Sequence, residues 1–238
     1  MGSIEPARQI LDQLKAGDSD NVKLEDCHGH IAEICRDEDG ADFLSSQLAT
    51  ASHLDKGRII AEIVPDASEL SRDQHGWQVI SNALSLGSTD SAEFLSRELV
   101  GSARESLFYN QHGDDLLDVI LQQQSRQDWE SVRDLVLENF VSFSTDSNAL
   151  RSVKTAIKYW PGDEWTLLTS HLQSEQGLLP QLLVNNDGCE VIRYILEVGA
   201  GDERRSLVDA IRPHLGLLGD LNTEAKRTLY WWVEGTRM

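Results

Sequence analysis

Two groups of side chains in this chain are of types that could bind a metal ion. Asp114, Asp115 and Asp118 lie within about one helical turn, and carboxylates are ligands for divalent cations. The second group lies near the N-terminus and comprises Cys27, His28, His30 and Cys35. Three carboxylates on a regular helix face rarely converge on one ion without help from a loop, and the Cys and His spacing matches no standard zinc pattern. We therefore expect no metal site and no cofactor.

No residue pattern in the sequence predicts catalysis. The chain contains no Gly-rich phosphate-binding loop, no nucleophile elbow and no metalloprotease helix. Two histidines, His75 and His112, occupy the same place in two similar phrases, where we interpret them as forming local hydrogen bonds. The sequence predicts a protein that is not an enzyme and has no catalytic residues.

The phrase that contains these histidines recurs along the chain. Asp73-Gln74-His75-Gly76 is followed by an aliphatic pair, and five further segments keep parts of the same pattern. We call the small residue of each copy the hinge, and the hinges are Gly40, Gly76, Gly113, Ala149, Gly188 and Ala225. The intervals between them are 36, 37, 36, 39 and 37 residues. A period of this size predicts stacked supersecondary units, hence a solenoid.

Each hinge is followed by apolar residues at helical spacing, such as Leu116-Leu117 with Ile120-Leu121. A second amphipathic segment precedes each later hinge, such as Leu135-Val136 with Phe140. Residues four apart share one face of a helix, so each unit is predicted as helix, loop, hinge, helix. About six such units stacked together predict an all-α fold, an α-α superhelix.

The two ends of the array are predicted to be caps. Residues 1–24 form an N-terminal cap segment with apolar residues at helical spacing, and residues 25–238 form the repeat domain. At the other end we interpret Trp231 and Trp232 as closing an exposed end of the core, with a ligand platform as the alternative. Residues 160–165 fall in the longest interval and are the best candidate for an inserted loop.

The chain is strongly acidic, with a formal net charge of −19. Residues 1–124 contain 23 acidic and 9 basic residues, whereas residues 125–238 contain 17 and 12. Such a field repels phosphate backbones and anionic membranes, and it favours basic or neutral partners. The alternative is a highly soluble surface with no meaning for partners. We expect neither DNA nor a membrane as a partner.

The sequence predicts neither a transmembrane helix nor a secretory signal. It has no run of about 18 apolar residues and no basic, apolar N-terminal signal. Three cysteines form no paired framework, which is consistent with a reducing compartment. The expected location is the cytoplasm, and the nucleus is not excluded.

The hinge phrase resembles the Pumilio (PUF) repeat. The likeness extends to residues 30–40, which are similar to the first repeat of a Pumilio homology domain, and to residues 80–88, which are similar to the second. Residues 211–214 resemble the segment before the final repeat, so the likeness covers about residues 24–235. The resemblance implies a curved solenoid whose concave face binds single-stranded RNA, one base per repeat. The family usually has eight repeats, and six are found here.

The resemblance also names the residues that would read bases. In the family the first and fifth residues after the hinge touch the base edge, and the second stacks between bases. None of the six sets here matches the usual reader for uracil, adenine or guanine. Cys189 with Arg193 resembles the pairing associated with cytosine, but Glu190 holds its stacking position.

These positions divide by charge along the chain. We predict an acidic partner-binding end and a basic end that binds a partner or RNA, unless the face is merely solvated and idle. The acidic end comprises Asp42, Trp77, Gln78, Asp114, Asp115 and Asp118. The basic end comprises Arg151, Lys154, Cys189, Arg193, Lys226, Arg227 and Tyr230. Electrostatic complementarity would suit a protein partner of matching charge.

Two functions follow from this reading. The first is a PUF-like protein-interaction or assembly scaffold in which sequence-specific RNA recognition is largely lost. The alternative is a divergent single-stranded RNA-binding post-transcriptional regulator that uses the C-terminal repeats, with weak RNA binding around Arg151, Cys189, Arg193 and Arg227.

Overall fold

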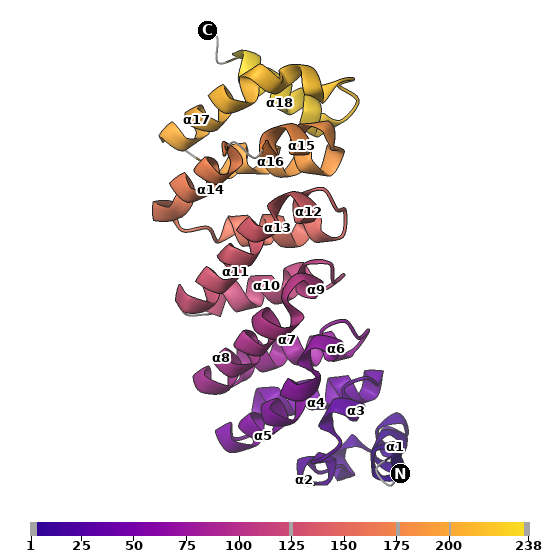
Figure 1. The fold of residues 1–238 in the computed structure, drawn as a ribbon. Helices are drawn as coiled ribbons and strands as arrows, with labels where there is room; N and C mark the ends of the chain where they lie inside the picture. The colour runs from indigo at the N-terminus through magenta and orange to yellow at the C-terminus, as the bar shows by residue number, and fades with distance from the viewer. Residues whose placement is uncertain (1–3, 124–125, 175–176, 200, 236–238) are drawn as a thin grey trace. The chain divides into compact units, whose positions relative to one another are not determined.

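Every regular element is a helix in the part of the chain that the computed structural model describes, which is residues 4–123, 126–174, 177–199 and 201–235 (Figure 1). This confirms the predicted all-α class. The chain divides into two compact units, residues 1–129 and 130–238. None of the described helices is long and apolar enough to cross a bilayer.

Unit 1 contains the first three repeats. Its helices are α1 (Ile4–Lys15), α2 (Leu24–Cys27), α3 (Ile31–Ile34), α4 (Glu38–Thr50), α5 (His53–Ile63), α6 (Ala67–Leu70), α7 (Gly76–Leu86), α8 (Thr89–Glu98), α9 (Arg104–Phe108) and α10 (Gly113–Gln123). Unit 2 contains the last three repeats. Helix α11 (Arg126–Glu138) runs into it and is followed by α12 (Phe140–Ser144), α13 (Ala149–Lys158), α14 (Trp165–Leu172), α15 (Leu178–Val184), α16 (Asn186–Val198), α17 (Gly201–Ile211) and α18 (Glu224–Gly235).

Most repeats contain a third, short helix where the sequence predicted a loop. The short helices are α3, α6, α9, α12 and α15, and a 3₁₀ segment, Arg212–Leu218, takes their place in the last repeat. Each of them buries apolar residues; in α9, for example, Leu107 and Phe108 are 1% and 0% exposed. The predicted loop is therefore a packed part of the core.

In the second to fifth repeats, the acidic or amide residue of the hinge phrase caps the helix that follows. Asp73 Oδ1 accepts hydrogen bonds from the backbone N–H groups of His75 (3.0 Å) and Gly76 (2.9 Å). Asn185 Oδ1 accepts in the same way from Asp187 (2.8 Å) and Gly188 (3.0 Å). These bonds satisfy N–H groups that have no partner within the helix. These bonds explain why an acidic or amide residue recurs at this place in the second to fifth repeats, whereas Asp37 of the first repeat makes no such bond.

Two of these capping residues are asparagines that also reach back to the preceding repeat. Asn110 Nδ2 donates to the carbonyl of Ser71 at 2.6 Å, and Asn110 is only 6% exposed. Asn185 Nδ2 lies 3.4 Å from the carbonyl of Thr145. A buried carbonyl oxygen without a hydrogen-bond donor lowers the stability of the fold. The amide oxygen therefore caps the helix, and the amide nitrogen bonds the carbonyl of the preceding repeat.

The hinge glycines are required by close packing. A Cβ atom on Gly40 would lie 2.3 Å from the carbonyl oxygen of Ile34, and on Gly188 it would lie 2.4 Å from that of Leu182. Neither glycine is among those with positive φ. The start of the second helix therefore runs directly against the end of the short helix before it.

The two predicted caps have different outcomes. Helix α1 packs on α4 and buries Ala7, Ile10 and Leu14, although residues 1–3 lie outside the described chain. At the other end Trp231 is 70% exposed, so the prediction that it closes the core is wrong. Trp232 lies under the Arg204 guanidinium, 5.0 Å from the ring centroid.

Candidate binding face

The predicted site residues lie on the second helix of each repeat. We call the first, second, fifth and sixth residues after each hinge the reading row. Helix α7 packs against α4 and α10 in unit 1, and α16 packs against α13 and α18 in unit 2. The row therefore runs across three neighbouring helices in each unit, and the structure brings the predicted residues of each unit together.

The reading row of unit 1 is acidic. Asp42 on α4 and Asp115 on α10 are exposed, and Asp114 and Asp118 on α10 are half-buried. They flank α7, where Gln78 is exposed. Carboxylates on both sides of the central helix would repel a phosphate backbone and attract a cationic segment.

Trp77, at the centre of this row, is stacked on the next repeat. Its ring lies parallel to that of His112, with centroids 4.3 Å apart and an interplanar angle of 8°. Burial lowers the pKa of His112, although Asp115 and Asp114 oppose the shift, and this favours the uncharged imidazole. One face of the indole is thus already occupied by a side chain of the protein.

In the basic row of unit 2, a glutamate forms ion pairs with two of the predicted cations. Glu190 Oε1 accepts from Lys154 Nζ at 2.7 Å and from Arg193 Nη2 at 2.6 Å, and Glu190 Oε2 accepts from Arg193 Nε at 2.9 Å. Arg193 Nη1 also pairs with Glu197. The hydrogen bonds from Arg193, then those from Lys154, hold the pKa of Glu190 at about 2. Two of the predicted cations are therefore neutralised within the protein.

The network should make a pH-dependent contribution to stability. The folded pKa of Glu190 lies below its ordinary 4.5, so the contribution is complete above about pH 4.5 and is lost as the pH falls toward 2. We expect Glu190→Gln to lower the free energy of unfolding by about 1–2 kcal/mol at pH 7, after allowance for solvent screening. Urea melts of both proteins at several pH values should converge as the pH falls toward 2. A constant difference would contradict this assignment.

The structure buries two members of the predicted basic end. Cys189 is fully buried, with its Sγ 3.3 Å from the carbonyl oxygen of Leu183, so the prediction that it contacts a partner is wrong. Burial raises the pKa of its thiol to about 11. Lys226, the equivalent residue of the last repeat, is only 9% exposed. Arg151, Arg227 and Tyr230 are on the surface as predicted.

The sequence interpretation did not assign two aromatic residues to the row. Tyr194 and Trp231 are the sixth residues after their hinges. Lys154 Nζ lies 5.6 Å from the centroid of the Tyr194 ring, and Trp231 meets Tyr230 edge to face at 6.4 Å. Each lies four residues after a stacking position, and this i, i+4 relation could have identified them.

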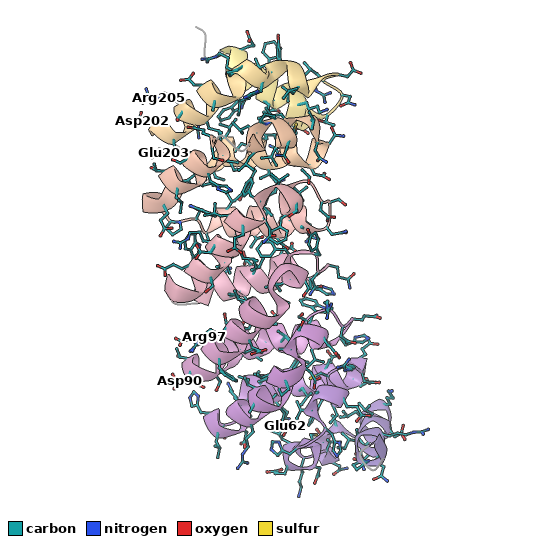
Figure 2. All side chains as sticks on the ribbon, in the orientation of Figure 1. Glu62, Asp90, Arg97, Asp202, Glu203 and Arg205 are labelled. Atoms are coloured by element: carbon teal, nitrogen blue, oxygen red, sulfur yellow. The ribbon has the colours of Figure 1, made fainter. Side chains whose placement is uncertain are left out.

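The N-terminal cysteines and histidines are dispersed into structural contacts. Burial raises the pKa of Cys27 to about 11 and that of Cys35 to about 12. His28 Nδ1 lies 2.9 Å from Glu62 Oε1, and Gly29 N donates to Glu62 Oε2 at 2.7 Å; Figure 2 labels Glu62. Within the described part of the chain, no three His, Cys, Asp or Glu side chains are placed to hold a metal ion.

No family model matches the sequence. Solved structures, however, match nearly the whole chain. The Puf3 RNA-binding domain bound to a Cox17 RNA recognition sequence matches with a TM-score of 0.73 and 22% identity, over 96% of this chain and 69% of that one. PUF-8 in complex with PBE-RNA matches at 0.76 and 18%, over 94% and 65%. The fold is that of a Puf repeat domain.

A third match supports the same fold at lower identity. The RNA-binding domain of yeast Puf5p bound to SMX2 RNA has a TM-score of 0.76 and 13% identity, over 98% of this chain and 68% of that one. The chain thus spans about two thirds of the length of these Puf domains. The superhelical arrangement predicted from the repeats is confirmed.

Proposed function

We propose that this chain is a non-catalytic Puf-like binding module that acts as a protein-interaction or assembly scaffold, with sequence-specific RNA recognition largely lost. The observation that carries this proposal is the state of the reading row. Glu190 engages Lys154 and Arg193, Cys189 is buried, and Trp77 is stacked on the next repeat. Good bidentate base contacts contribute about 1–3 kcal/mol each, so their loss removes base discrimination.

The negative charge of the unit 1 row favours a partner that carries a basic segment. By sequence, residues 1–129 contain 24 acidic and 10 basic residues. A partner with lysines or arginines would be attracted and aligned by Asp42 and Asp115 on either side of α7. The three cysteines are unpaired thiols, which is compatible with a cytoplasmic or nuclear location.

Purification of the tagged chain from its native cell, with and without ribonuclease, tests the scaffold function. We expect ribonuclease-resistant protein partners, and the double variant Asp42→Asn, Asp115→Asn should retain at least tenfold less of them because it removes two exposed carboxylates of the row. The matched control is Asp90→Asn, an exposed carboxylate on α8 outside the row (Figure 2). Recovery of RNA-dependent partners alone, or equal loss in both variants, would count against the proposal.

Single-stranded RNA binding by the row of unit 2 is the second candidate function, and one observation favours it. Trp231 is 70% exposed, and it lies beside Tyr230 and one helical turn from Arg227. Aromatic and arginine side chains together form sequence-tolerant stacking surfaces for unpaired bases. The Puf domains that this fold resembles are themselves RNA complexes.

Fluorescence anisotropy with a random single-stranded RNA pool separates the two functions. The scaffold proposal predicts no binding tighter than roughly micromolar at low salt. Tighter binding that weakens steeply between about 50 and 200 mM salt would establish the second candidate instead. In that case Trp231→Ala should weaken binding about tenfold, whereas Asp42→Ala should leave it unchanged or stronger.

A further inference from the structure

Glu190 occupies a position at which neighbouring repeats offer positive charge to a ligand. It is the second residue after the hinge of α16, and its two oxygens accept three N–H groups from two cations. Lys154 comes from α13, one repeat earlier, and Arg193 comes from the next turn of α16. The three side chains are 22–27% exposed, so the cluster opens to solvent.

The same donors would suit an external anion. Arginine and lysine bind carboxylates and phosphates with the same N–H groups, and the two N–H groups that Arg193 directs at Glu190 form the bidentate fork typical of both. Lys154 also lies over the Tyr194 ring, which leaves an aromatic surface next to the cations. Without Glu190, this part of the row would offer positive charge and a stacking group.

We propose that Glu190 acts as an internal anion that occupies the N–H donors of Lys154 and Arg193, and so excludes single-stranded RNA from the middle of the unit 2 row. This inference rests on the proposed loss of RNA recognition and names the residue that causes it. Glu190 is a specificity-determining residue: it accepts hydrogen bonds from both cations and places a negative charge at a position that stacks on bases in Puf repeats.

A salt bridge that only joined two repeats would have the same geometry but a different consequence. Removal of a purely structural pair would lower stability and leave RNA affinity unchanged. Removal of an internal competitor frees Lys154 and the Nε and Nη2 groups of Arg193, whose Nη1 stays paired with Glu197. Each phosphate that the freed charge neutralises adds about 0.7 to the slope of log affinity against log salt for single strands. RNA affinity and its salt dependence therefore distinguish the two roles.

The test is the affinity of the full chain for a random single-stranded RNA pool, measured for the wild type and for Glu190→Gln. We expect Glu190→Gln to bind at least tenfold more tightly at low salt, with a steeper salt dependence. Adding Lys154→Met to this variant should remove most of the gain. If Glu190→Gln does not fold, as judged by circular dichroism, Glu190→Ala takes its place because alanine is the best helix former.

The matched control is Asp202→Asn. It changes the net charge by the same amount and releases Arg205, but both residues lie on α17, outside the reading row (Figure 2). An affinity for Glu190→Gln within threefold of the wild type, or a gain equal to that of Asp202→Asn, would overturn the inference. Tight RNA binding by the wild type would instead refute the proposed function, and the comparison of Glu190→Gln with the wild type would still decide the role of Glu190.

Discussion

Gly40→Ala is expected to lower the free energy of unfolding by about 2–3 kcal/mol, the cost of forcing an extra methyl into a packed core. The new Cβ would lie 2.3 Å from the Ile34 carbonyl oxygen and 2.8 Å from Ile34 Cγ2. The first neighbour is backbone, so a rotamer change cannot relieve the clash. Helix α4 must move away from α3, and it carries Asp42 with it.

Gly57→Ala is the matched control for this prediction, because Gly57 is a glycine within a helix of the same unit. A Cβ there would have Ser91 Oγ as its nearest neighbour, at 3.7 Å, which is ordinary contact. Alanine should therefore stabilise α5 by about 0.5–1 kcal/mol through its higher helix propensity. Urea melts of the two variants should shift in opposite directions. Equal stability of the two would refute the close-packing explanation of the hinge.

The sequence predicted the long helices well because their pattern repeats. Stripes such as Val191, Ile192 and Ile195 lie on one helix face, and six copies in phase leave little choice of fold. The short helices were missed for a physical reason. Elements of four to seven residues, such as α6 and α12, are shorter than the window over which helical periodicity can be measured.

The site was predicted less completely, because position in a repeat does not determine partners. The sequence placed Lys154, Glu190 and Arg193 on one row, but it gave no sign that the carboxylate binds both cations. That contact joins side chains 36 residues apart and depends on how α13 packs against α16. The burial of Cys189 depends on how the short helix α15 packs against α16 in the same repeat, and the sequence predicted a loop where α15 lies.

Asn110→Asp is expected to destabilise unit 1 by about 2–3 kcal/mol at pH 7. The aspartate could still accept from the backbone N–H of His112, which lies 3.1 Å from Asn110 Oδ1. It would lose the donor to the Ser71 carbonyl and place a buried carboxylate oxygen about as close to that carbonyl as Nδ2 is now, 2.6 Å. Asp73→Asn is the control, since Asp73 acts only as an acceptor in its two capping bonds, and its cost should stay below about 0.5 kcal/mol.

The loss caused by Asn110→Asp should diminish in acid. Burial and the facing carbonyl would raise the folded pKa of the new carboxyl group above its unfolded value, so the folded state binds the proton more tightly. As the pH falls from 7 toward 5, protonation restores a donor to Ser71 and the variant should regain stability relative to the wild type. Paired thermal melts at pH 7 and pH 5 measure this recovery, which Asp73→Asn should not show. A deficit that does not change with pH would mean that the Asn110 amide is not the donor that closes the seam between repeats 2 and 3.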